Sequence, residues 1–168
     1  MAATREKVDH VDALRALWAR ALPDVDTTGM AIFGRARRIS RRLSAEIDQI
    51  LKRYGLDGGQ FYVLAALRRA GPPFALRPTE IFRSLMISSG GLTNRLDRLE
   101  KAGLIRRRPS PEDARSELAE LTAKGRRLLE EAFRADMAAE ARLLKGLSAR
   151  EREDLAGLLQ KLSMSLGV

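Results

Sequence analysis

The chain lacks cysteine altogether, and among its 168 residues it has a single histidine, His10. These absences exclude disulfides and thiolate metal sites, and the scattered acids offer no metal-ligand set. No run of about 18 apolar residues is present, so we expect no transmembrane helix. The opening MAATREKVDH lacks the apolar core of a signal peptide. We therefore expect a cytoplasmic protein without a cofactor and without a membrane partner.

The usual signatures of catalysis are missing as well. The sequence has no Gly-rich phosphate loop and no nucleophile elbow. The closely spaced acids Glu112 and Asp113 fall on a predicted exposed turn, which is a poor place for a catalytic acid or base. We expect a protein that is not an enzyme.

Basic residues exceed acidic ones, 31 against 22, which gives a net charge of +9. The excess lies in the centre of the chain and not in a detachable tail. Such a balance favours a polyanionic partner, with nucleic acid first and an acidic membrane second. A soluble basic protein with no polyanion target is the alternative.

Apolar periodicity, capping residues and turn residues predict a mainly helical protein with a small β hairpin. Helices are predicted over 8–21, 30–53, 57–69, 78–85, 88–102, 123–146 and 148–162, and strands over 104–109 and 116–121. We divide the chain into N-terminal helices (1–56), a self-contained middle domain (57–121) and C-terminal helices (122–168). The outer helices carry more apolar surface than the middle domain can cover. This surplus favours a homodimer, and packing of the outer helices on each other is the alternative.

The middle domain has the element order of a winged helix-turn-helix. Two short helices are joined by a tight turn, the second is expected to be capped by Ser88, and a hairpin follows it. In this geometry the second helix lies in the major groove of DNA. Gly90 and Gly91 cost helix stability, and close approach to DNA is the reason we assign to them.

A helical wheel of 88–101 separates a core face from an outer face. Leu92, Leu96 and Leu99 form the core face, whereas Asn94 lies opposite it with Thr93 and Arg98 beside it. Asparagine can read adenine and arginine can read guanine, and the helix start favours phosphate. The predicted contacts of this helix with DNA are Ser88, Ser89, Gly90, Thr93, Asn94 and Arg98. A merely solvated helix face is the alternative.

The hairpin adds further basic residues. Side chains alternate along a strand, so Arg106 and Arg108 are predicted to contact phosphate while Arg107 points towards the protein body. Arg115, at the wing tip, can enter a minor groove. Its alternative role is an ion pair with Asp113 or Glu112.

The stretch LRPTEIFRSLMISSGGLTNRLDRLEKAGLIRRRPSPEDARSELAELTAKGRRLL resembles the MarR family of winged-helix transcription factors. The resemblance is strong over about 57–130. It implies a homodimer whose first and last helices dimerise, which binds pseudo-palindromic operators, usually as a repressor, and which a small aromatic or phenolic ligand can release. The family pattern has two arginines after the wing aspartate, and here the first is Ala114, which weakens the expected wing contact.

Residues 18–24, of the form W-x-R-x-x-P-D, look like the urate-responsive branch of this family. The resemblance implies an effector site at Trp18, Arg95 and Arg107, with Tyr62 where that branch has an aspartate. We expect an aromatic anion, phenolic or purine, with Tyr62 shifting the choice away from urate. Alternatively, Trp18 staples the first helix and Arg95 pairs with Asp97, Glu100 or another acid.

Two further alternatives stay open for the protein as a whole. One is a DNA-binding regulator without a small-molecule effector. The other is a winged helix that contacts protein or RNA, which would not need a basic outer face.

Overall fold

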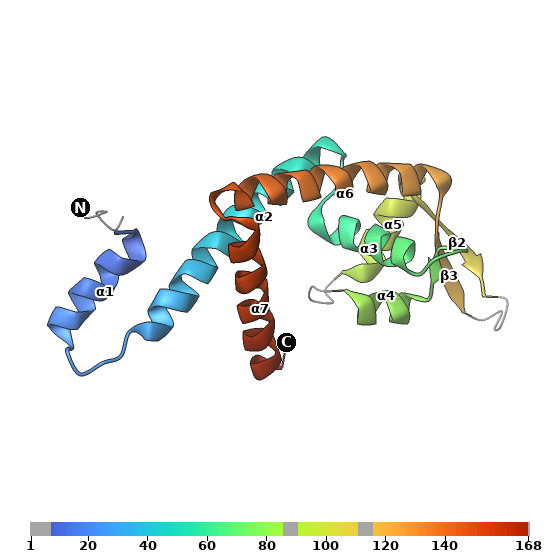
Figure 1. The fold of residues 1–168 in the computed structure, drawn as a ribbon. Coiled ribbons are helices and arrows are strands. Elements are labelled where there is room, and N and C mark those ends of the chain that lie inside the picture. The colour runs from blue at the N-terminus through green and yellow to red at the C-terminus, as the bar shows by residue number, and fades with distance from the viewer. Residues whose placement is uncertain (1–7, 86–90, 111–115, 168) are drawn as a thin grey trace. The chain divides into compact units, whose positions relative to one another are not determined.

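The computed structural model describes residues 8–85, 91–110 and 116–167 (Figure 1). The chain forms two compact units, residues 1–46 and residues 47–168. The predicted fold class, mainly helical with a small β wing, is confirmed. No helix in the described part of the chain is both long enough and apolar enough to cross a bilayer.

The first unit is built around helix α1 (His10–Ala21) and the start of helix α2 (Arg35–Arg53). Asp9 caps α1, and both Asp9 and Asp12 form ion pairs with Arg35, at 2.9 and 2.7 Å. Val11 is buried and lies close to Gly34. We predicted one helix over 30–53, but its first turn, η1 (Met30–Gly34), is π-helical and α2 begins only afterwards.

The second unit holds the core, which lies among α3 (Gly58–Arg69), α4 (Pro78–Ser84) and α5 (Leu92–Lys101). Asp57 caps α3 through a capping box, and Pro78 occupies the first turn of α4. The fully buried side chains of this core include Leu51, Val63, Leu64, Leu67, Ile81 and Leu99. The core draws on all three predicted segments of the chain. Leu51 comes from segment 1–56 and Ala132 from segment 122–168, and both pack with residues of segment 57–121.

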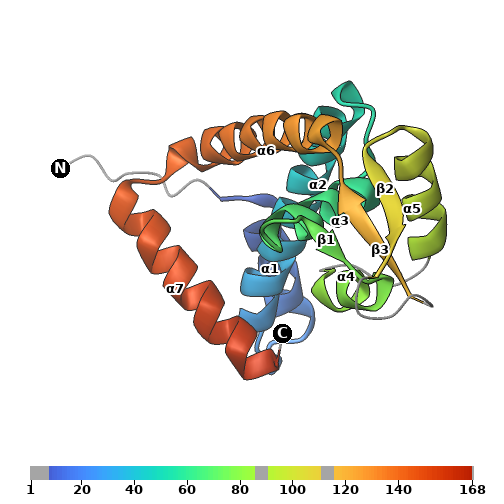
Figure 2. The same cartoon turned by 90° about the vertical axis from the view of Figure 1, so that its right-hand side faces the viewer.

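A three-stranded antiparallel sheet flanks these helices, in the order β1-β3-β2 (Figure 2). The strands are β1 (Ala75–Leu76), β2 (Ile105–Pro109) and β3 (Glu117–Leu121). Ile105 pairs with Leu121 and Arg107 with Ala119, so these four share one face, on which all but Arg107 are buried. Arg106 and Glu120 pair on the opposite face.

Helix α6 (Ala123–Leu143) follows the sheet directly and starts on Thr122, whose hydroxyl accepts from the Gly125 N–H. A 3₁₀ turn, η2 (Leu144–Gly146), leads to α7 (Ala149–Leu166). We predicted that the last helix ends near 162, but it continues to Leu166, where Gly167 adopts a φ of 70°. The large apolar side chains of α7 are exposed in the single chain, namely Leu155, Leu158, Leu159, Met164 and Leu166.

Candidate nucleic-acid interface and effector residues

Helix α5 begins later than its sequence suggests. Gly91 is the N-cap residue, with a φ of 85°, and as a glycine it has no side chain that could cap the helix. The prediction that Ser88 is the N-cap is therefore wrong: the left-handed turn that only glycine adopts readily sets the helix start instead. No described atom lies within 4 Å of where a β-carbon would sit at Gly91, so conformation explains this glycine. Ser88, Ser89 and Gly90 lie outside the described residues.

The outer face of α5 is the one the helical wheel predicts. Thr93, Asn94 and Arg98 are exposed, whereas Leu96 and Leu99 are buried in the core. The two leucines fix the rotation of the helix, because their burial leaves the other three side chains in solvent. The face thus offers an amide, a hydroxyl and a guanidinium together, all of which can hydrogen-bond to DNA.

Strand β2 divides its arginines between two faces, as the alternation predicts. Arg106 donates from Nη2 to Oε1 of Glu120 at 2.6 Å, and Arg108 donates from Nε to Oε2 of Glu120 at 2.5 Å. Hydrogen bonds from Arg106, which has the larger effect, and from Arg108 hold the pKa of the Glu120 carboxyl below its ordinary value. Arg115 and Ala114 lie outside the described residues.

Arg107 points the other way and joins the wing to α5. It forms ion pairs with Asp97 and Glu100, and its own backbone N–H donates to Glu100 at 3.0 Å. The acids that we considered as partners of Arg95 are thus partners of Arg107. Any anion bound by Arg107 would share its guanidinium with these two carboxylates.

Arg95 lies on α5 against the first turn of α3. A β-carbon built on Gly59 would come within 2.6 Å of Cζ of Arg95, so the guanidinium occupies the space that the glycine leaves. Its Nη1 is buried and has no hydrogen-bond partner among the described residues, a costly arrangement for a charged group. Tyr62, three residues after Gly59 on α3, is half-buried. Its ring packs edge to face on that of Phe61, with 5.7 Å between the ring centroids.

Trp18 belongs to the first unit, where its surroundings are mostly apolar but include Asp26 and Thr27. It is 47% exposed and lines a cavity of about 270 Å³ together with Leu22, Val25 and Met30. The structure describes Trp18 within this unit, so its predicted role beside Arg95 stays a prediction.

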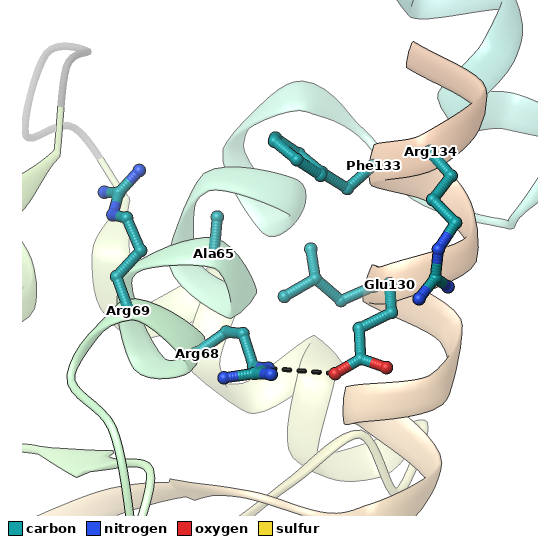
Figure 3. A pocket seen from close by; sticks show the side chains of 7 residues that line it. Ala65, Arg68, Arg69, Glu130, Phe133 and Arg134 are labelled. Carbon is teal, nitrogen blue, oxygen red and sulfur yellow. Dashed lines mark hydrogen bonds and ion pairs between the residues drawn. The ribbon is translucent and has the colours of Figure 1, made fainter. Parts of the chain in front are cut away.

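A cavity of about 440 Å³ between α3 and α6 was not predicted from the sequence (Figure 3). Ala65, Leu129 and Phe133 supply apolar walls. The charged lining consists of Arg68, Arg69, Arg134 and Glu130. Arg68 donates to Glu130 at 2.9 Å, which lowers the pKa of that carboxyl. Among the described residues that line it, three arginines against one glutamate leave the cavity with an excess of positive charge.

Comparison with known proteins identifies the family. The model of the MarR family matches residues 54–116. The HTH-type transcriptional regulator PecS of Dickeya dadantii is 36% identical over 149 residues, covering 89% of this chain and 90% of PecS. The multiple antibiotic resistance protein MarR of Salmonella typhimurium is 33% identical over 130 residues, covering 74% of this chain and 88% of that protein.

Solved structures agree with these relatives. BpsR of Bordetella bronchiseptica, solved to explain regulation of its DNA binding by 6-hydroxynicotinic acid, has a TM-score of 0.67 and 29% identity, covering 79% of this chain and 92% of BpsR. A MarR variant of Escherichia coli complexed with operator DNA has a TM-score of 0.66 and 28% identity. The match covers 87% of this chain and 97% of the MarR chain. The relatives and structural neighbours are transcriptional regulators and not enzymes. This chain therefore belongs to the MarR family of winged helix-turn-helix transcriptional regulators.

Proposed function

We propose that the protein is a homodimeric repressor that reads a pseudo-palindromic operator and that a small aromatic anion releases from DNA. The exposed face of α5, with Thr93, Asn94 and Arg98 beside the basic wing, carries the proposal. In the proposed complex the two α5 helices enter successive major grooves about 34 Å apart. The operator complex of the related MarR variant supports this mode of binding.

The apolar surface that the single chain exposes supports a dimer. Leu158 of α7 is 67% exposed, and Ile39 of α2 is 65% exposed. Helices with this much uncovered apolar surface usually pack against a partner. A second copy would supply that partner, in keeping with the proposed dimerisation role of the first and last helices.

The salt dependence of binding tests the proposal. We expect the dimer to bind a duplex selected from a random pool, and to lose about 10³-fold in affinity between 50 and 200 mM salt, because six or more phosphate contacts release their counterions. Fluorescence anisotropy would measure affinity, and analytical ultracentrifugation would measure the stoichiometry. A monomeric complex, weak salt dependence or preference for RNA would contradict the proposal and favour the protein- or RNA-binding alternative.

The effector proposal rests on Arg95. Its buried Nη1, without a partner among the described residues beside Gly59, supports a role in holding an anion, since a carboxylate would supply the missing hydrogen-bond acceptor. The regulation of BpsR by 6-hydroxynicotinic acid supports an aromatic acid as the class of ligand. Tyr62, Arg107 and Trp18 remain the other proposed effector residues. The cavity between α3 and α6 is a second candidate, favoured by its apolar walls and surplus arginines.

Substitution of Gly59 would move the guanidinium of Arg95 without removing its charge. We expect Gly59→Ala to displace the guanidinium, and to raise about tenfold the concentration of 6-hydroxynicotinate, urate or a hydroxybenzoate that releases the selected DNA. Gly58→Ala is the matched control, because no described atom crowds that position on the same helix turn. Release would be followed by anisotropy.

The outcomes of this titration are distinct. If no aromatic acid releases DNA from the wild type, the protein lacks the proposed effector. If release is unchanged in Gly59→Ala and Arg95→Ala but impaired in Phe133→Ala and Arg134→Gln, the effector binds in the cavity between α3 and α6.

A further inference from the structure

Glu120 occupies an unexpected place for an acid, between two arginines of the proposed DNA surface. Its carboxylate accepts from Arg106 with one oxygen and from Arg108 with the other. The side chain of Glu120 is 13% exposed, while that of Arg106 is 66% exposed. A largely covered carboxylate thus pairs with Arg106, which is mostly in solvent, and with Arg108, whose side chain is 32% exposed.

The strand register explains this arrangement. Glu120 lies on the central strand β3, directly opposite Arg106 of β2, and Arg108 is the next residue of β2 on the same face. On the other side Glu120 pairs with Ala75 of β1. A small neighbour on β1 and two arginines on β2 let the carboxylate accept from both guanidiniums.

Two consequences follow for an anionic partner. A guanidinium carries five N–H donors in a fixed fork, so one that donates to Glu120 retains others for phosphate oxygens. The ion pairs fix the direction of both side chains, which lowers the conformational cost of binding. At the same time one negative charge offsets half of the positive charge of the pair, which weakens attraction to any duplex whatever its sequence.

We propose that Glu120 is a positioning residue of the DNA interface: it aims Arg106 and Arg108 at the sugar-phosphate backbone and limits their affinity for DNA of any sequence. This inference rests on the proposed contact of these arginines with DNA. Base readout by α5 does not involve Glu120, so Glu120 lowers the affinity for specific and for non-specific duplexes by a similar factor.

The test is Glu120→Gln, which removes the charge and keeps the size of the side chain. We expect affinity for a random-sequence duplex at 100 mM salt to rise about fivefold, and the plot of log K against log salt to steepen by about 0.9, the value of one further phosphate contact. Affinity for the selected duplex should rise by a similar factor, because the phosphate contacts are common to both duplexes. Glu117→Gln is the matched control, since Glu117 is an exposed acid on the opposite face of the same strand.

A purely structural role for Glu120 would give another result. It would lower the melting temperature and weaken binding to all duplexes without steepening the salt dependence, and this outcome would overturn the inference. Glu120→Asp provides a second variant, which keeps the charge but is too short to reach both arginines; we expect its salt dependence to remain close to that of the wild type. A slope for Glu120→Gln that matches Glu117→Gln would also overturn the inference.

Arg106→Gln and Arg108→Gln distinguish failure of the inference from failure of the proposed DNA contact. If both variants keep the wild-type slope, the wing strand does not contact phosphate and the proposed contact fails. If each lowers the slope by about 0.9 while Glu120→Gln leaves it unchanged, the contact stands and only the role of Glu120 is overturned.

Discussion

Gly125→Ala is expected to lower the free energy of unfolding by about 3 kcal/mol or more, the upper range for overpacking a well-packed site. A β-carbon at position 125 would overlap the carbonyl oxygen of Leu104, and would lie 2.9 Å from its carbonyl carbon and 3.0 Å from Cδ1 of Leu121. The carbonyl belongs to the backbone and cannot rotate away. Its oxygen also accepts from the backbone N–H of Thr122 at 3.0 Å, so moving it breaks this bond.

Chemical denaturation followed by circular dichroism, at one fixed protein concentration, would measure this loss. Gly58→Ala is the control, because it adds the same methyl group near the start of a helix but meets no described atom within 4 Å. We expect the control to keep or slightly raise the stability, as alanine favours helix over glycine. If Gly125→Ala is as stable as the wild type, then the close approach of α6 to Leu104 is wrong.

Regular periodicity and local capping made most of the fold predictable. Leu96 and Leu99 recur at helical spacing on the buried face of α5, and Asp57, Thr122 and Ser148 each cap a helix that follows. The start of α5 was missed because Ser-Ser-Gly-Gly offers two competing signals, a serine cap and a left-handed glycine. Periodicity cannot choose between them, whereas the glycine conformation does.

The candidate site was predictable as far as local periodicity reaches. The helical period placed Asn94 and Arg98 in solvent, and the strand period separated Arg107 from Arg106 and Arg108. Which acid pairs with which arginine depends on the register between β2 and β3 and on how α5 meets the wing. The ion pairs with Asp97 and Glu100 are therefore formed by Arg107, whereas we had considered these acids as partners of Arg95. The cavity at Phe133 depends on the packing of α3 against α6, two helices that are distant in sequence.

Asn94→Ala and Arg98→Ala are each expected to reduce affinity for the selected operator roughly 10- to 100-fold, the value of one good side-chain contact with a base edge. Both side chains are exposed on α5, while the neighbouring Leu96 and Leu99 that hold the helix are untouched. The dimer and the thermal stability should therefore persist. Arg98→Ala should also weaken non-specific binding, because it removes a positive charge, whereas Asn94→Ala should not.

Footprinting and anisotropy on the selected duplex and on a random one would separate these effects. Lys101→Ala is the matched control, an exposed basic residue of α5 that lies three residues after Arg98 and farther from the helix start that we propose enters the groove. We expect Lys101→Ala to lower the affinity for both duplexes by the same small factor. Loss confined to the selected duplex in Asn94→Ala would assign base readout to this residue. If both variants footprint like the wild type, α5 does not read the operator, and the wing with its Arg106–Glu120–Arg108 cluster becomes the main contact with DNA.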